Sequence, residues 1–151
     1  MLSVLPPELP SAIERAQLES KDLRKTVSRL QGQLAGHEAA RLLEGDDLVG
    51  HRRVVVQALE AWDAAGLKSI ASSLSARNGV AAMLMSIGDP VAVVVARSQD
   101  VPVDAGKTLR ALLDRFGGRG GGRPELAQGA GLVGKSDDIL AAARDLLSGR
   151  V

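Results

Sequence analysis

Nineteen residues near the end of the chain combine residue types that could bind an anion. The stretch from Phe116 to Gly134, FGGRGGGRPELAQGAGLVG, contains eight glycines. Glycine in such density costs conformational entropy on folding, and a chain accepts it where the backbone must take a positive φ or approach another group closely. The stretch is therefore either a slack linker or a binding site.

Positive charge is concentrated in and just before this stretch. Between positions 107 and 123 a single acid, Asp114, stands against five basic residues: Lys107, Arg110, Arg115, Arg119 and Arg123. Backbone N–H groups in glycine turns, with arginine side chains beside them, form an anion cradle suited to phosphate. The residues alone leave two interpretations open: a phosphate or nucleic-acid site, and a structural glycine-rich turn with solvated arginines.

Composition limits what can position such a site. A chain of 151 residues with 45% apolar residues can bury a core, and its net charge of +1 gives no global attraction to nucleic acid or membrane. The lack of cysteine excludes disulfides, zinc-thiolate sites and a cysteine nucleophile. No apolar run reaches the ~20 residues of a membrane helix, and the N-terminal residues do not resemble a signal peptide. We expect a cytoplasmic protein without membrane contact.

Residues 1–45 are predicted to hold a long coiled-coil helix. From Ser11 the chain runs without proline to position 45, and its seam residues are spaced by three and four: Ile13, Ala16, Ser20, Leu23, Val27, Leu30, Leu34 and His37. We expect a helix of about thirty residues that pairs with a second copy to give a homodimer. The alternative is that this helix lies on the globular part.

Residues 46–151 are predicted to form a globular domain of class α+β, whose glycine-rich motif spans 117–134. A strand covered on both faces is expected at 53–59, and a hairpin at 80–97 around Gly88-Asp89-Pro90. Asp63 and Asp104 are expected to cap two helices, and a last helix begins at Ser136. The expected order is long helix, then β-α-β-β-α, a glycine-rich loop and α around a small mixed sheet.

The segment GGRGGGRPELAQGAG resembles a signature of the C-terminal, DHH-associated domain of alanyl-tRNA synthetases. The order of the expected elements extends the resemblance to nearly the whole chain. Arg119 and Glu125 replace the lysine and aspartate usual in the signature, and both keep the charge. The resemblance implies a non-catalytic module that dimerises and contacts the outer corner of tRNA, with an alanine-accepting tRNA as partner.

The predicted nucleic-acid-binding residues combine the motif with the basic side chains before it. They are Gly117, Gly118, Arg119, Gly120, Gly121, Gly122, Arg123, Pro124 and Gln128, together with Lys107, Arg110 and Arg115. Recognition by shape and phosphate contacts needs no aromatic platform, which suits a chain whose aromatic residues are Trp62 and Phe116.

No catalytic residue, metal or cofactor is expected. The editing domains related to alanyl-tRNA synthetases use a His-x-x-x-His pair with cysteine and histidine, whereas His37 and His51 lie fourteen residues apart. The Asp-His-His motif of DHH phosphoesterases is missing too. The match of Ala105 to Thr108 to a phosphate loop lacks its first glycine. Acidic pairs at 46–47 and 137–138 are expected at helix or loop ends.

Two alternatives stay open. The chain could be the substrate-binding half of a DHH-type phosphoesterase, although the glycine loop of those relatives ends in a histidine where Arg123 stands here. It could also be a purely structural oligomerisation domain, in which the glycines only let the chain turn and the first helix provides the function.

Overall fold

The long apolar segments of the chain form the centre of a six-stranded sheet. This computed structural model describes residues 9–44, 47–49 and 52–149. Strand β3 (Val80–Ser86) is buried along its whole length; it pairs parallel with β2 (Arg52–Leu59) and antiparallel with β4 (Ala92–Arg97). The shorter strands β1 (Asp47–Val49), β6 (Leu126–Ala130) and β5 (Arg119–Gly122) complete the order β1-β2-β3-β4-β6-β5.

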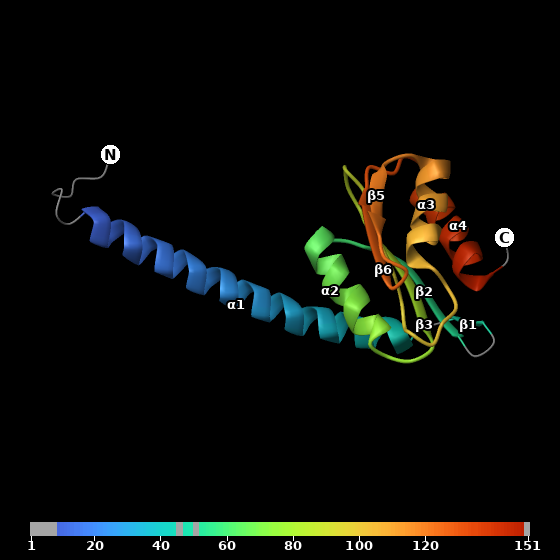
Figure 1. Cartoon of the computed structure of the whole chain (residues 1–151), viewed down its shortest axis with the longest axis horizontal. Helices are drawn as coiled ribbons and strands as arrows, with labels where there is room; N and C mark the ends of the chain where they lie inside the picture. The colour runs from blue at the N-terminus through green and yellow to red at the C-terminus, as the bar shows by residue number, and fades with distance from the viewer. Residues whose placement is uncertain (1–8, 45–46, 50–51, 150–151) are drawn as a thin grey trace.

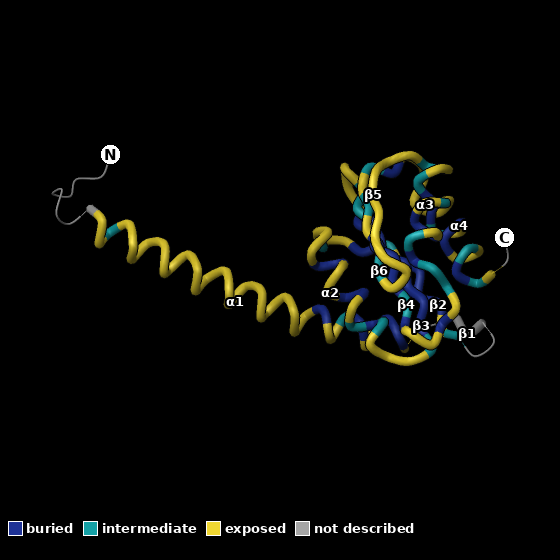
Figure 2. Tube along the Cα trace, in the orientation of Figure 1, coloured by how far each residue is buried: buried dark blue, intermediate teal, exposed yellow. Residues whose placement is uncertain are grey.

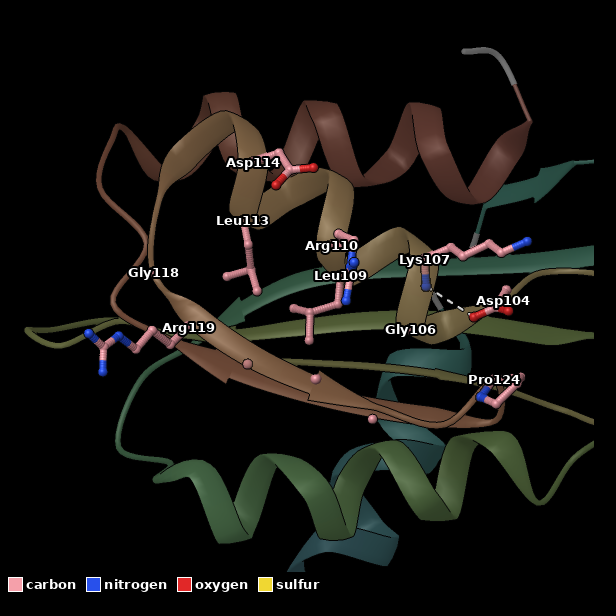
Figure 3. Close-up of a pocket in the computed structure, with 13 residues that line it drawn as sticks. Asp104, Gly106, Lys107, Leu109, Arg110, Leu113, Asp114, Gly118, Arg119 and Pro124 are labelled. Atoms are coloured by element: carbon pink, nitrogen blue, oxygen red, sulfur yellow. Dashed lines mark hydrogen bonds between the residues drawn. The ribbon is translucent and has the colours of Figure 1, made fainter.

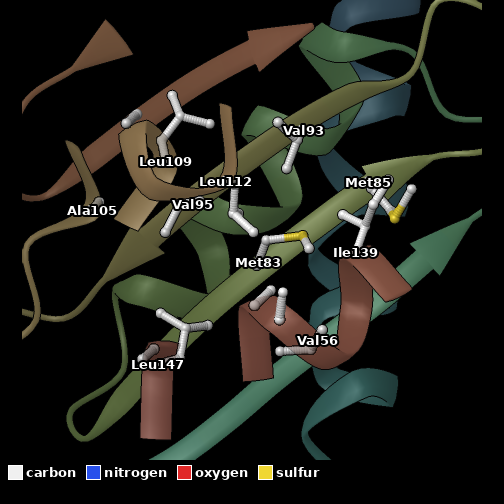
Figure 4. Packing of buried hydrophobic residues seen from close by; sticks show 14 of the residues in the cluster. Val56, Met83, Met85, Val93, Val95, Ala105, Leu109, Leu112, Ile139 and Leu147 are labelled. Carbon is white, nitrogen blue, oxygen red and sulfur yellow. The ribbon is translucent and has the colours of Figure 1, made fainter. Parts of the chain in front are cut away.

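Helices cover both faces of the sheet, and this explains the unbroken apolar runs (Figure 1). Side chains alternate along a strand, so Met83 and Met85 pack beneath α3 (Ala105–Phe116) and α4 (Ser136–Ser148), as Figure 4 shows. Leu84 points to the other face, against α2 (Ala64–Ser75) and the end of α1 (Leu9–Glu44).

Helix α1 is longer than predicted and projects away from the sheet (Figure 1). Its 36 residues span ~54 Å at 1.5 Å per residue. Among the described side chains, the buried residues of α1 all lie in its C-terminal third, and they are Ala35, Ala39, Leu42 and Leu43. The preceding turns are almost entirely exposed, as the yellow trace in Figure 2 shows.

The helix starts were largely predicted. Asp63 accepts a hydrogen bond from the Gly66 N–H (2.8 Å), and Asp104 accepts one from the Lys107 N–H (3.0 Å). Helix α4 begins at Ser136 as expected, but Lys135 occupies its N-cap without a side-chain hydrogen bond. The acidic pair at 137–138 lies in its first turn, where carboxylates favour the helix dipole.

The fold class and the mixed sheet agree with the sequence-based prediction, with two differences. Strand β1 was not predicted, and the glycine-rich stretch is not a loop, because residues 119–122 and 126–130 pair as an antiparallel hairpin. Glycine is depleted in strands because it offers no side chain to pack. In this hairpin the lack of side chains is what allows the two strands to pair.

Candidate nucleic-acid interface

Alternate glycines in and just before β5 leave no space for a side chain. A Cβ on Gly118 would lie 2.5 Å from the Ala130 carbonyl oxygen, and a Cβ on Gly120 or Gly122 would run into the backbone of β6. Gly118 also has φ +101°, which L side chains rarely adopt. At Gly121, in contrast, no atom lies within 4 Å of the Cβ position. Gly118, Gly120 and Gly122 therefore serve the hairpin, whereas packing does not require glycine at position 121.

The pairing pattern also directs backbone groups outward. The Arg123 N–H donates to the Leu126 carbonyl (2.9 Å), and the register pairs Gly122 with Ala127 and Gly121 with Gln128. Hydrogen-bonded pairs alternate with non-hydrogen-bonded pairs in an antiparallel ladder. Gly120 and Gly122 fall at the non-hydrogen-bonded positions, so their N–H and C=O groups point away from β6. Since β5 is the last strand of the sheet, these groups lie along its free edge.

Helix α3 packs directly on the glycine backbone. In Figure 3, Leu109 and Leu113 point from α3 toward the hairpin. A Leu113 methyl carbon lies 3.2 Å from the Cβ position of Gly118, and a Leu109 methyl carbon lies 3.4 Å from that of Gly129. The small residues of the hairpin thus let α3 lie close enough to form one wall of a groove.

The groove between α3 and β5 has a volume of about 770 Å³ and is lined by 13 residues (Figure 3). This volume is within the ~300–1,000 Å³ typical of small-molecule sites. From the predicted set, the lining includes Lys107, Gly118, Arg119, Gly120, Gly121, Gly122, Pro124 and Arg110. The structure therefore brings two sequence segments of predicted site residues, 107–110 and 118–124, around one concave surface.

The basic side chains surround this groove without converging at one point. In Figure 3, Arg119 and Lys107 extend outward at opposite ends, and Arg110 lies between them. Asp104 and Asp114 also line the groove, and Asp104 already caps the N-terminus of α3. Charge is therefore spread along the surface, an arrangement that suits an extended polyanion better than one isolated phosphate.

The remaining predicted residues lie outside the groove lining. The Arg115 guanidinium sits 5.3 Å from the centre of the Phe116 ring, a cation–π contact. Phe116 itself packs against the core beneath α3 and α4. Arg123 and Gln128 are exposed on the hairpin, and Gly117 ends α3 with φ +81°.

Sequence reasoning missed Arg97, which holds the turn of the hairpin. Its Nε donates to the Pro124 carbonyl (3.0 Å), and its backbone N–H donates to the Glu125 carbonyl (3.0 Å). The Ala105 N–H of α3 donates to the same Pro124 carbonyl (2.9 Å). Arg97 thus fixes the hairpin turn against the start of α3. The available signal was an arginine ending an apolar strand, but the Pro124 carbonyl lies 27 residues away in sequence.

No metal site is found among the described residues, which contain no group of three or more His, Cys, Asp or Glu side chains placed to share an ion. His37 is exposed on α1, whereas His51 and Asp46 lie outside the described residues. In the same ranges, 9–44, 47–49 and 52–149, no helix has both the length and the apolar character needed to cross a bilayer.

Comparison with known proteins decides the family. The model of the DHHA1 domain matches residues 51–149. The chain belongs to the DHHA1 domain family. It is 37% identical over 134 residues to an alanine–tRNA ligase of Nostoc, an alignment that covers 85% of this chain and 15% of that ligase. The chain thus spans about one seventh of the length of such relatives.

Two solved structures share the fold. The C-Ala domain of Aquifex aeolicus alanyl-tRNA synthetase is 26% identical, with a TM-score of 0.62, and the match covers 69% of this chain and 98% of that domain. RecJ of Thermus thermophilus, solved with Mg²⁺, superimposes with a TM-score of 0.64 at 19% identity over 90% of this chain and 20% of that protein. The second likeness shows the fold alone.

Proposed function

We propose that this DHHA1 domain is a non-catalytic tRNA-binding and dimerising module of a cytoplasmic alanine–tRNA ligase or a related protein. The observation that carries the proposal is the groove between α3 and β5, where Lys107, Arg110 and Arg119 flank exposed glycine backbone. Similarity to alanine–tRNA ligases supports tRNA, and an alanine-accepting one in particular, as the polyanion.

The proposed contact joins RNA phosphates to basic side chains that are spread along the hairpin. Arg119 and Arg123 stand on either side of the three glycines of β5, and both are exposed. Arginine presents a planar fork of donors that matches phosphate oxygens. Such contacts position a folded RNA by its backbone and release bound counterions, so the affinity falls as salt rises.

The dimerising part of the proposal rests on α1. The large apolar side chains at Ile13, Leu23, Val27, Leu30 and Leu34 are all exposed, although the helix packs at its C-terminal end. A contiguous exposed apolar surface of this kind marks an interaction site. A second copy of α1 would cover it, giving a homodimer with the two globular parts free to bind RNA.

The test of RNA binding is fluorescence anisotropy of labelled alanine-accepting tRNA over a salt series. The variant R119A/R123A removes two charges from the hairpin, and R53A/R77A is the matched control, since Arg53 and Arg77 are exposed near the junction of α2 and β3. We expect the slope of log K against log salt to drop by roughly 1.4–1.8 in the hairpin variant, at 0.7–0.9 per lost phosphate contact.

Three outcomes separate the candidate functions. Weakened binding in R119A/R123A with unchanged binding in the control supports the tRNA module. Tight binding of short nucleotides with no preference for folded tRNA would favour the phosphoesterase half. Dimers that bind no RNA at low salt would leave only a structural oligomerisation domain.

A further inference from the structure

The exposed side of α1 carries a seven-residue repeat. Numbered as heptads from Ile13, the a positions are Ile13, Ser20, Val27 and Leu34, and the d positions are Ala16, Leu23, Leu30 and His37. The large apolar members of this set are 43% to 65% exposed. An a/d repeat of this period forms the seam of a coiled coil, because it keeps one stripe facing a partner helix.

The globular part packs against the opposite side of the helix. Ala35, Ala39, Leu42 and Leu43 occupy b, c and f positions, which point away from the a/d seam at 3.6 residues per turn. The sheet and α2 therefore leave the seam open even at Leu34, next to the buried Ala35. All eight seam residues from Ile13 to His37 are exposed, so the seam is open to a partner helix over this length.

The a and d residues along the seam indicate the number of helices in the coiled coil, and the charged g and e residues indicate their orientation. In parallel coiled coils, β-branched residues at a with leucine at d favour two strands over three or four, and here Ile13 and Val27 stand at a while Leu23 and Leu30 stand at d. The charged flanking residues favour a parallel orientation. Glu19 is a g residue, and Arg24 is the following e residue. In a parallel pair in register, each Glu19 lies beside the Arg24 of the other copy, which gives two opposite-charge contacts.

We infer that α1 pairs with α1 of a second copy as a parallel, in-register, two-stranded coiled coil running from Ile13 to His37. This inference rests on the proposed homodimer and adds its orientation. The next seam positions, Arg41 and Glu44, are charged, and Arg41 is engaged with Glu38 of its own helix, which lowers the Glu38 carboxyl pKa. The seam thus ends where the globular part begins, after ~36 Å.

Cysteine crosslinking tests the orientation, and the chain has no cysteine of its own. The variant I13C places one thiol at the start of the seam. In the parallel pair the two thiols face each other within the 4.4–6.8 Å Cα separation of disulfides, whereas in an antiparallel pair they lie ~36 Å apart. L18C is the matched control, because Leu18 is an exposed f residue away from the seam.

We expect I13C to form a covalent dimer under oxidised glutathione at least ~10-fold faster than L18C. A mixture of I13C and H37C chains of different mass reports the opposite arrangement, since these positions meet only in an antiparallel pair. Preferential crosslinking between I13C and H37C would overturn the parallel orientation while leaving the dimer intact. Sedimentation of the parent chain as a monomer would overturn the dimer itself, and RNA binding is measured separately.

Charge exchange gives an independent readout. E19R places like charges at both g/e contacts and is expected to weaken dimerisation roughly 3- to 10-fold, since exposed ion pairs contribute modestly and two of them are lost. E19R/R24E restores the opposite charges in the parallel register and is expected to recover most of the loss. A double variant no tighter than E19R would contradict the pairing of these two residues.

Discussion

The two antiparallel hairpins of this domain are stabilised in opposite ways. The β3/β4 hairpin lies in the middle of the sheet, and every residue of β3 is buried. The β5/β6 hairpin lies at the edge, and every residue of β5 is exposed. The first is held by its own side chains packing against four helices. In the second, Arg119 is the only residue of β5 with a side chain, and the hairpin is held by its neighbours, namely α3, the Arg97 side chain and the strand β4.

The contrast between the two hairpins assigns stability mainly to β3/β4 and ligand binding mainly to β5/β6. A hairpin whose side chains fill the core cannot offer its backbone or side chains to a ligand. The glycine hairpin has less packing energy, but it presents backbone N–H and C=O groups, arginines and an open position at Gly121. Changes in the first hairpin should therefore alter folding alone, whereas some changes in the second should alter binding alone.

The largest expected effect is in the central hairpin. Leu84 is fully buried between β3 and the helices α1 and α2. Leu84→Ala should lower the free energy of unfolding by about 2–5 kcal/mol, because it removes apolar contacts and leaves a cavity. Urea unfolding followed by circular dichroism measures the loss, and a change below ~1 kcal/mol would show that the core is not continuous there.

A glycine of the edge hairpin comes next. Gly120→Ala places a Cβ against the backbone of Gln128 and Gly129, so the two strands must separate. We expect a loss of about 1–3 kcal/mol, the range of overpacking. The same denaturation measurement checks it. An unchanged stability would mean that the close pairing of β5 and β6 is not required.

Removal of the Arg97 clamp should act on both properties. Arg97→Ala deletes the hydrogen bond to the Pro124 carbonyl, with an expected loss of about 1–2 kcal/mol, and frees the turn that sets Arg123 beside the groove. tRNA affinity should fall while the salt slope stays that of the parent chain, because no phosphate contact is removed. A reduced slope would show instead that Arg97 contacts RNA directly.

A smaller effect depends on pH. The Asp100 carboxylate accepts hydrogen bonds from the Ser98 hydroxyl (2.6 Å) and the Gly79 N–H (3.0 Å), and these hold its pKa below the usual value. A lowered folded-state pKa gives stability that is present above the unfolded pKa and lost as pH falls through the folded one. Asp100→Asn should therefore lose less stability than the parent between pH 5 and pH ~2, as measured by urea titration at each pH.

Much of the fold followed from residue patterns, and the site followed only in part. Asp63 and Asp104 as caps, and the burial of β2 on both faces of the sheet, follow from local chemistry that propensity and periodicity describe. The glycine stretch was mistaken for a loop because its strand pairing depends on backbone approach, which no side-chain pattern records. Arg97 was missed because its partner carbonyl comes from a turn that only the tertiary fold brings near.

The sequence identified a segment rich in basic residues and glycine, but it did not show which of these residues lie on one surface. Lys107 and Arg119 belong to one groove, whereas Arg115 is held over Phe116. The consecutive glycines looked equivalent in the sequence. Only the structure distinguishes Gly120, which the hairpin needs, from Gly121, which it does not.

The most direct test of the account is tRNA binding by Gly121→Val, measured beside its stability. The open position lines the groove and tolerates a side chain, so the free energy of unfolding should stay within ~0.5 kcal/mol of the parent. We predict that affinity for tRNA nevertheless falls at least ~10-fold, because the valine projects from the same side of β5 as Arg119 and Arg123 and occupies space that RNA needs between them. Unchanged tRNA affinity in this stable variant would contradict the proposal that β5 and its arginines form the RNA-binding surface.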